Sequence, residues 1–404
     1  MRSKVPLSTY AEIIMGQSPT GDTCNSDGMG IPLLNGPTEF GSKFPSPVQF
    51  TSDAKRISRV GDILFCVRGS TTGRMNYADQ EYAIGRGLAA IRGINGFPTV
   101  FVKGLIENNL ETLLNMATGS TFPNVSKDMI NAFLVEEIDK QSSQKIAHIL
   151  SILDDKIELN RKMNQTLESM ASAIFKSWFV DFDPVHVKLT CKDQVELESA
   201  AKKLGISKAI LDLFPSEFEE SELGMIPKGW EVVKIEEVLK RYQAPKRYKK
   251  EAVESFGKTV VFEQGANIIL GYHDGEAEFQ ATEDEPMFIF GDHTCVMKLS
   301  TKPFSISENV IPLSGLRRNG YWTYYATYGQ QTFQEYRRHW SELIVKEIVM
   351  ADEQLCDFFA EKIKPLILKI EQNFLENNEL IKTRDTLLPK LLSGEIDVSE
   401  LEIK

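Results

Sequence analysis

Loops near the N-terminus carry side chains suited to hydrogen bonding with a nucleic acid. The segment Arg68-Gly69-Ser70-Thr71-Thr72-Gly73-Arg74 joins two apolar runs, and Arg86 stands between two glycines. Arginine donates paired hydrogen bonds to guanine and binds phosphate, and serine and threonine hydroxyls also bind phosphate. Gln17 and Asn35 lie in other glycine-containing loops, and their amides suit adenine. The candidate DNA-contacting residues of this region are Gln17, Asn35, Arg68, Ser70, Thr71, Thr72, Arg74 and Arg86.

Basic and aromatic residues are interleaved in a second region, between residues 240 and 340. The clusters are Lys246-Arg247-Tyr248-Lys249-Lys250, Arg317-Arg318 before Tyr321-Trp322, and Tyr336-Arg337-Arg338-His339-Trp340. Such interleaving suits a nucleic-acid-binding face. An exposed charge run is often only a solvated surface, so each cluster alone is weak evidence, but clusters in both regions favour DNA binding. The candidates here are Lys246, Arg247, Lys249, His273, Arg317 and Arg318.

Motifs for catalysis and nucleotide binding are absent from the sequence. It contains no phosphate-binding loop of the GxxxxGK[ST] type, no HExxH and no GxSxG. The five histidines do not stand at metal-ligand spacing. The five cysteines are scattered and never form CxxC, which excludes a disulfide framework and the usual cysteine zinc site. We therefore expect no catalytic residue, no metal site and no cofactor in this chain.

One short pattern occurs twice. Lys156-Ile157-Glu158-x-Asn160-x-x-x-Asn164-x-x-Leu167 returns 213 residues later as Lys369-Ile370-Glu371-x-Asn373-x-x-x-Asn377-x-x-Leu380. Solenoid repeats are about 20–50 residues long, so this period indicates a duplicated half, one globular unit plus one long helix. A duplicated chain can present two similar surfaces about a pseudo-two-fold axis, and duplex DNA is a target with that geometry.

The pattern lies within two long segments of helical periodicity. Apolar residues recur at three- and four-residue spacing from Ile146 to Trp178 and from Phe359 to Leu391, which predicts two amphipathic helices. At ~1.5 Å per residue, the first would be just under ~60 Å long. Matching apolar seams favour a coiled-coil pair. Pro365 should start, kink or interrupt the second helix because proline cannot donate the helical hydrogen bond, and Gly394 should end it.

The repeated asparagines fall on or near the apolar seams. They are open to two interpretations: buried polar residues that set the register of a coiled coil, or residues that contact a partner subunit. The candidate helix-pair or partner-contacting residues are Asn160, Asn164, Trp178, Asn373, Asn377 and Leu391.

Composition limits the class of protein without deciding it. A length of 404 residues predicts two domains or more. The lack of a long apolar stretch or an N-terminal signal region predicts a cytoplasmic protein. The net charge is −11, yet residues 1–140 hold 13 basic against 14 acidic residues and residues 230–340 hold 14 against 15. The acidity therefore belongs to the helical segments, and each globular region can still present a basic face to DNA.

The expected fold class is α+β, with two β-rich globular domains joined by two long helices that pack as an antiparallel coiled-coil pair, in a pseudo-two-fold internal duplication. The expected boundaries are 1–140 for the first globular domain, 141–180 for the central helix, 181–229 for a connector, 230–350 for the second globular domain and 351–404 for the C-terminal helix.

Motifs along nearly the whole chain resemble those of the specificity subunits of type I restriction-modification systems. The resembling segments are Ala11–Pro19, Gly61-Asp62-Ile63-Leu64 leading to Arg68-Gly69, Gly85-Arg86-Gly87, Phe175–Pro184, Ile226–Trp230, Phe290–Thr294 and Leu387–Glu395. In this comparison Gly291-Asp292-His293-Thr294 takes the place of Gly61-Asp62-Ile63-Leu64 in the second half. That difference suggests that the two halves recognise different sequences.

The resemblance implies two target-recognition domains, each contacting one half of a bipartite, asymmetric DNA site, with the paired helices setting the gap. It also implies no catalytic residue and no cofactor of the chain's own. The partners it implies are double-stranded DNA, two methyltransferase (modification) subunits and, through them, restriction/translocase subunits. The competing interpretation is a coiled-coil protein-binding scaffold without sequence-specific DNA binding, which the acidic net charge favours.

Overall fold

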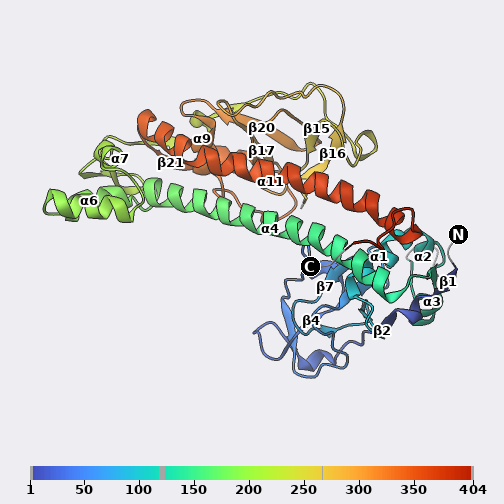
Figure 1. Ribbon diagram of the computed structural model, residues 1–404. Coiled ribbons are helices and arrows are strands. Elements are labelled where there is room, and N and C mark those ends of the chain that lie inside the picture. Colours follow the sequence, from blue (N-terminus) through green and yellow to red (C-terminus); the bar gives the residue numbers. More distant parts are fainter. Residues whose placement is uncertain (1–2, 118–122, 266, 402–404) are drawn as a thin grey trace. The chain divides into compact units, whose positions relative to one another are not determined.

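The structure is a computed structural model that describes residues 3–117, 123–265 and 267–401. The chain divides into two compact units. Unit 1 comprises residues 1–160 and 375–404, and unit 2 comprises residues 161–374. Figure 1 labels several elements of each unit, and each unit is described here by itself.

Unit 1 is built on two four-stranded sheets. The first has the order β2-β9-β6-β7 and is antiparallel throughout; the second has the order β3-β5-β4-β8, in which β4 and β8 run parallel. Strands β1 and β10 form a separate two-stranded antiparallel sheet in this unit. Its strands are β1 (Lys4–Pro6), β2 (Ala11–Met15), β3 (Cys24–Asn25), β4 (Ile31–Leu34), β5 (Gln49–Thr51), β6 (Ile63–Cys66), β7 (Met75–Tyr77), β8 (Ala83–Ile84), β9 (Leu88–Gly93) and β10 (Leu134–Glu136).

Short helices cover the first sheet of unit 1. They are α1 (Thr99–Asn108), α2 (Leu110–Asn115) and α3 (Lys127–Ala132), with the 3₁₀ turns η1 (Leu7–Thr9), η2 (Gly21–Thr23) and η3 (Pro37–Glu39). One apolar core joins this sheet to α1 and to the first turns of the long helix α4; it includes Phe65, Ile91, Phe101 and Ile146. The apolar runs around Phe65 and Ile91 are thus buried strands.

Unit 2 repeats this plan with a different sequence. Its main sheet has the order β14-β20-β17-β18, and its second sheet has the order β16-β15-β19, in which β15 and β19 run parallel. The pair β13 and β21 corresponds to β1 and β10. The strands are β13 (Glu231–Lys234), β14 (Leu239–Arg241), β15 (Thr259–Phe262), β16 (Ile269–His273), β17 (Met287–Gly291), β18 (Met297–Ser300), β19 (Phe304–Ile306), β20 (Val310–Gly315) and β21 (Glu347–Met350). The main sheets of the two units share one strand order and each second sheet contains one parallel pair, which confirms the internal duplication, although the second sheet has four strands in unit 1 and three in unit 2.

The remaining elements of unit 2 are short helices and one hairpin. The helices are α5 (Asp183–Thr190), α6 (Gln194–Lys203), α7 (Lys208–Leu213), α8 (Ile235–Val238), η4 (Lys250–Ala252), α9 (Gly320–Thr327) and α10 (Trp340–Ile344), and the hairpin is β11 (Phe218–Ser221) with β12 (Gly224–Pro227). An aromatic core holds this unit together. It contains Trp178, whose side chain is 1% exposed and meets Phe214 edge to face.

Two long helices each belong partly to both units. Helix α4 spans Lys140–Phe179 and helix α11 spans Glu353–Ser393. Gly394 ends α11 with a φ of 81°, the left-handed conformation that glycine adopts readily, as predicted. Of the three effects expected of Pro365, which were a start, a kink or an interruption of the helix, the start and the interruption are excluded, because α11 is one helix through this residue. Pro365 is exposed, so water can satisfy the carbonyl that its missing N–H leaves free.

Asparagines join the two helices by the same hydrogen bonds in each unit. In unit 1, Asn160 Nδ2 donates to Asn377 Oδ1 at 3.0 Å, and Asn377 Nδ2 donates to the carbonyl of Ile157 at 3.4 Å. In unit 2, Asn373 Nδ2 donates to Asn164 Oδ1 at 2.8 Å, and Asn164 Nδ2 donates to the carbonyl of Ile370 at 3.2 Å. The start of one helix meets the end of the other, so the pair is antiparallel. Buried amides bonded in this way favour the interpretation that they set the register.

Candidate nucleic-acid interface

The carboxyl ends of four strands meet at one edge of unit 1. Backbone hydrogen bonds link them: Gly16 N–H donates to the carbonyl of Leu88 at 2.9 Å, Gly85 N–H to that of Leu34 at 2.8 Å and Val67 N–H to that of Gly87 at 2.9 Å. We call this the strand-end edge of unit 1, formed by the loops that follow β2, β4, β6 and β8. Every DNA-contacting candidate of the N-terminal region lies on it: Gln17, Asn35, Arg68, Ser70, Thr71, Thr72, Arg74 and Arg86.

The loop of residues 68–74 has a fixed shape. Gly69 and Gly73 adopt φ values of 94° and 92°, which residues with a Cβ rarely adopt. The Thr72 hydroxyl donates to the carbonyls of Gly69 at 2.8 Å and Pro123 at 2.9 Å. This hydroxyl is therefore used to hold the loop, while the side chains of Arg68 and Arg74 are exposed.

The neighbouring loops approach each other so closely that only glycine fits. A Cβ on Gly85 would lie 2.3 Å from Oδ1 of Asn35, and one on Gly16 would lie 2.1 Å from the carbonyl oxygen of Gly85. This close approach brings the exposed residues Gln17, Asn35 and Arg86 together. The edge thus combines amide and guanidinium donors on a rigid backbone, which is an arrangement suited to base edges and phosphates.

Unit 2 has a corresponding strand-end edge. Ser307 N–H donates to the carbonyl of Phe262 at 2.8 Å, as Gly85 does to Leu34. Asp292 N–H donates to the carbonyl of Asn309 at 3.0 Å, as Val67 does to Gly87.

These bonds correct one motif alignment made from the sequence. Gly291 pairs with Val310 as Cys66 pairs with Leu88, so Gly291-Asp292-His293-Thr294 follows the central strand β17. Gly61-Asp62 instead precedes the matching strand β6. The two motifs therefore occupy opposite ends of equivalent strands. The similar residue types of the two motifs suggest that they are equivalent, but the strand register excludes this.

Arginines surround a hollow of about 300 Å³ on the unit 2 edge, which Arg241, Arg247 and Arg338 line together with Asp292 and Glu308. The Arg247 guanidinium donates to the carbonyls of Ser307 at 3.0 Å and Val310 at 2.8 Å. Burial and the adjacent Arg241 lower the pKa of Arg247 below its ordinary value. An arginine remains charged at neutral pH all the same, so this edge holds a concentrated positive charge balanced by two carboxylates.

The other lysine and histidine candidates of unit 2 form a stack nearby. Lys246 Nζ lies 4.0 Å from the centre of the Tyr248 ring, and that ring stacks on His273 with centres 4.4 Å apart. His273 Nε2 also lies 2.9 Å from the Ser305 hydroxyl. Lys249 is within 4.0 Å of the Glu308 carboxylate.

Arg317 and Arg318 are not brought to this edge. They follow Gly315 at the end of β20, whereas the strand-end edge lies at the start of that strand. Arg318 donates from Nε and Nη2 to the carbonyl of Ala351 at 2.9 and 2.7 Å, and Arg317 forms an ion pair with Glu231 at 2.8 Å. These contacts favour a structural role near the start of α11.

Three residues on the unit 2 edge were not among the sequence candidates: Arg241, His293 and Arg338. Arg338 lies 3.7 Å from the Asp292 carboxylate, and the His293 ring lies 4.8 Å from that of Tyr336. Arg241 ends a strand, and its charge there is the signal that could have identified it. The other two needed the strand register, because the sequence does not reveal that the loop containing Arg338 returns to the end of β17.

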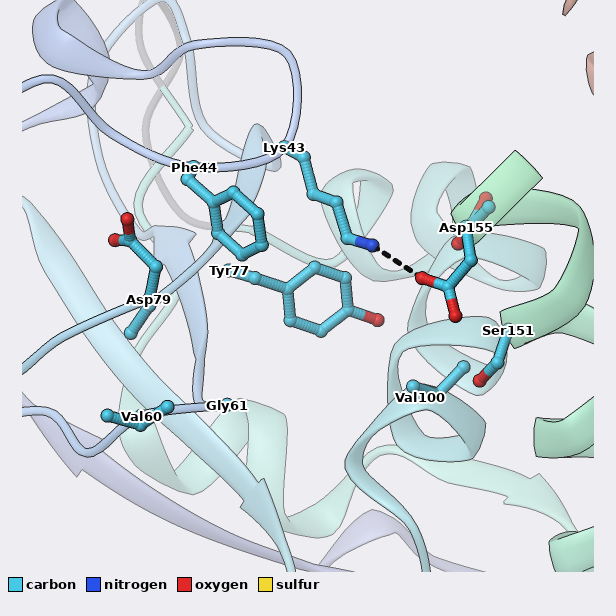
Figure 2. A pocket seen from close by; sticks show the side chains of 11 residues that line it. Lys43, Phe44, Val60, Gly61, Tyr77, Asp79, Val100, Ser151 and Asp155 are labelled. Atoms are coloured by element: carbon cyan, nitrogen blue, oxygen red, sulfur yellow. Dashed lines mark hydrogen bonds and ion pairs between the residues drawn. The ribbon is translucent and has the colours of Figure 1, made fainter. Parts of the chain in front are cut away.

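A separate hollow of about 390 Å³ lies in unit 1 between the loop of Lys43, strand β7 and helix α4 (Figure 2). Lys43 Nζ is 2.9 Å from Asp155, and Tyr77 faces the space between them. Among the described residues the Tyr77 hydroxyl has no hydrogen-bond partner; burial first, and then the Asp154 carboxylate, raise its pKa above the ordinary value. Tyr77 pairs with Ile63 at the start of β6, so the hollow is at the opposite end of the sheet from Arg68.

The helix-pair candidates are buried inside the two units. Asn160 and Asn373 are at most 1% exposed, Asn377 is 7% exposed and Asn164 is half-buried, while Trp178 belongs to the core of unit 2 and Leu391 to that of unit 1. Within the described residues no group of histidine, cysteine, aspartate and glutamate side chains could hold a metal ion. Over the same part of the chain, no helix is long and apolar enough to cross a membrane.

Comparison with known proteins gives one consistent family. A family model described as the type I restriction modification DNA specificity domain matches residues 5–169. The type I restriction enzyme HindI specificity subunit of Haemophilus influenzae is 26% identical over 409 residues, covering 85% of this chain and 88% of the relative. The MjaIX specificity subunit of Methanocaldococcus jannaschii is 26% identical over 320 residues, covering 72% of this chain and 67% of the relative.

A solved structure shares the fold along the chain. The S subunit of the type I restriction-modification system from M. genitalium has 16% sequence identity, covers 96% of both chains and gives a TM-score of 0.52. At this identity the likeness concerns the fold alone. The duplicated α+β units, the antiparallel helix pair and the similarity to these relatives together support a specificity subunit of the type I restriction-modification kind.

Proposed function

We propose that this chain is the non-catalytic DNA-recognition subunit of a type I restriction-modification complex, and that each strand-end edge contacts one half of a bipartite, asymmetric duplex site. The first target-recognition domain would be residues 1–140 and the second residues 230–350. The observation that carries the proposal is the pair of equivalent edges. Matching main-chain hydrogen bonds hold the loops together within each edge, but the exposed side chains of the two edges differ.

Differences in side chain at equal backbone positions are what two different half-sites require. Arg86 in unit 1 corresponds to Glu308 in unit 2, because both stand two residues after the parallel strand of the second sheet and two before Leu88 or Val310. A guanidinium and a carboxylate prefer different partners on DNA, the carboxylate accepting from cytosine N4 and the guanidinium donating to guanine. The two edges therefore suit different base sequences.

The helix pair supports the second half of the proposal, that α4 and α11 set the gap between half-sites and dock the partners. Helices of 40 and 41 residues are each ~60 Å long, more than a domain of this size needs for its own core. Their asparagine bonds would fix the register. The partners would be two methyltransferase subunits, and through them restriction/translocase subunits, acting in the cytoplasm.

Mapping of methylated bases tests the recognition claim directly. The chain is produced together with its methyltransferase partner in a host that lacks other DNA methylation, and modified positions are mapped across the genome. One bipartite, asymmetric motif with an unspecified gap is the expected result. Methylation without a motif, or no methylation from an assembled complex, would contradict the proposal.

An insertion tests the role of the helices. Four residues placed after Lys162 add about one turn to α4, and a matched insertion goes into the exposed turn at Glu222–Leu223 of the β11–β12 hairpin. The first insertion should change the length of the unspecified gap while both half-sites stay the same, and the second should change neither. An unchanged gap in the first variant rules out the spacer role.

The acidic helices and the lack of catalytic motifs also fit a protein-binding scaffold. Binding of the assembled complex to random duplex DNA separates the two functions. A recognition subunit should bind with an affinity that falls steeply as salt increases, because phosphate contacts release counterions. A scaffold should show a flat dependence.

A further inference from the structure

We propose that His293 in unit 2 and Arg68 in unit 1 are corresponding base-contacting residues, and that their difference sets one position of each half-site. This inference rests on the proposed function and adds to it the identity of a specificity-determining pair. It starts from the strand register, which places both residues at the same point of the fold.

The correspondence rests on three matched backbone bonds. Cys66 pairs with Leu88 as Gly291 pairs with Val310. The following residue donates to an equivalent carbonyl in each unit, Val67 to Gly87 and Asp292 to Asn309. The same residue then accepts from the loop before α3 or α10, since Val125 N–H donates to Val67 and His339 N–H donates to Asp292. Arg68 and His293 come next in each chain segment.

Both side chains stand at a tip where a duplex could reach them. Arg68 is exposed, and His293 is partly exposed. Around His293 stand Tyr336, whose side chain is 76% exposed, and Arg338, so an aromatic and a basic residue flank it. Histidine and tyrosine at such a tip, next to basic residues, are suited to the edge and the face of a base.

The orientation of the His293 ring is fixed by Gln264. The Gln264 side-chain carbonyl accepts a hydrogen bond from the main-chain N–H of His293 at 2.9 Å. The side-chain amide nitrogen of Gln264 must therefore be the atom that faces ring atom Nδ1 of His293 at 3.3 Å. That nitrogen can only donate, and Nδ1 therefore accepts. The neutral ring consequently carries its proton on Nε2, and this N–H has no partner in the described part of the chain.

The neutral imidazole of His293, with one N–H donor, and the guanidinium of Arg68, with five N–H donors, recognise bases differently. A guanidinium can donate two parallel hydrogen bonds to guanine O6 and N7, a pattern that no other base offers. A single imidazole N–H that is placed to reach N7 can bond to guanine or adenine, because N7 is an acceptor at the same place on both purines, whereas a pyrimidine has no acceptor at that place. Unit 1 should therefore require guanine at the position that faces Arg68, whereas unit 2 should accept either purine at the position that faces His293.

Exchange of the two residues tests this assignment in the assembled complex by methylation mapping. The variant H293R should turn a degenerate purine position of one half-site into guanine, with discrimination against adenine on the order of ten- to a hundredfold. The variant R68H should relax a guanine position in the other half-site to either purine. The matched control H186R places an arginine on the exposed face of α5 and should leave the motif unchanged.

A second variant at position 293 keeps the test informative if the complex with H293R does not assemble. Glutamine at position 293 can donate and accept together, as adenine recognition requires, so H293Q should shift the same position toward adenine. If the wild-type complex yields a bipartite motif but H293R, H293Q and R68H all assemble and leave every position as it was, the assignment is wrong. If the wild-type complex yields no motif, the proposed function itself fails, and the two failures are thus distinguishable.

Discussion

The strand-end edges of the two units differ in chemistry although they share a backbone plan. In unit 1 the edge presents Arg68, Arg74 and Arg86, with no acidic residue in the loops 67–74 and 85–87. In unit 2 the equivalent edge presents arginines interleaved with Asp292 and Glu308. Both edges are held by main-chain hydrogen bonds at matching positions. The sheet therefore determines where side chains stand, while the sequence of each loop determines what they can bind.

The largest effect on DNA binding is expected from double substitutions of arginines, made on one edge at a time. Replacing Arg68 and Arg74 together by alanine should weaken binding of the complex to its own duplex by about 30- to 25,000-fold, because two arginine contacts of about 1–3 kcal/mol each contribute about 2–6 kcal/mol. Replacing Arg241 and Arg338 together should weaken it in the same direction but through the other half-site. Titration against duplexes carrying one intact and one scrambled half-site measures this.

Each double variant should lose its preference for only one half-site. If both variants lose the same half-site, or if R68A with R74A binds its target as tightly as the wild type, the two edges do not divide the target between them.

Arg318 distinguishes a structural arginine from a DNA-contacting one. The Arg318 guanidinium donates two hydrogen bonds to the carbonyl of Ala351, close to the start of α11. Replacing Arg318 by alanine removes both of these hydrogen bonds. Hydrogen bonds from charged groups contribute about 1.5–3 kcal/mol, so R318A should lower the unfolding free energy of unit 2 by about that amount. Hydrogen exchange in β21 and the first turns of α11 measures the change, and the DNA motif should stay the same. A changed motif with unchanged protection would make Arg318 a DNA contact.

Asparagines at equivalent places should be equally important in the two units. N160A leaves the Asn377 carbonyl in unit 1 without its donor, and N373A does the same to Asn164 in unit 2. A buried polar group without a partner costs about 1–3 kcal/mol. Each variant should therefore reduce hydrogen-exchange protection in its own unit by that amount. Replacing the exposed Gln165 by alanine is the control. An effect in one unit alone would mean that the matching hydrogen bonds do not carry matching energy.

The smallest expected effect concerns the starts of the long helices. Asp139 accepts from Ser142 N–H at 2.9 Å and from the Ser142 hydroxyl at 2.7 Å, and the hydroxyl bond is the main cause that lowers the pKa of Asp139. A lost N-terminal cap costs about 0.5–1 kcal/mol at an exposed site, so D139A should destabilise unit 1 slightly. Asp352, at the same repeat position, has a leucine where Ser142 stands, so D352A should cost less.

The pH dependence of this cap has a definite sign. Because the folded pKa of Asp139 is lower than the unfolded value, its contribution is complete above the unfolded pKa of about 4 and is lost as pH falls through the folded pKa. The stability difference between wild type and D139A should therefore shrink in acid. A difference that grows below pH ~4 contradicts the assigned cap.

The sequence predicted the parts of this fold that depend on periodicity and repetition. Apolar spacing identified both long helices, and the repeated Asn160 and Asn373 indicated the duplication, because such patterns are local. The sequence also predicted a loop around Arg68, where glycines and arginines occur together, and this segment does lie between β6 and β7. These signals need no knowledge of which strands are neighbours.

The rest depended on contacts between distant segments. Arg318 looked like Arg68 in the sequence, yet it follows the other end of its strand, and only the pairing of β20 with β17 shows this. His293 was aligned with Ile63 by similar letters, and the strand register moves it to the position of Arg68. Strand order and register are long-range properties, and a short motif carries no information about them.

The backbone bonds that define the two edges have a consequence for how such a protein can change. Because Val67 and Asp292 hold their loops through main-chain atoms, almost any side chain can follow them without weakening the sheet. Stability and specificity are thus controlled by different atoms. Under the proposed function, a mutation at a tip residue would alter the recognised sequence while the sheet keeps its hydrogen bonds, so new specificities would arise in single steps without unstable intermediates.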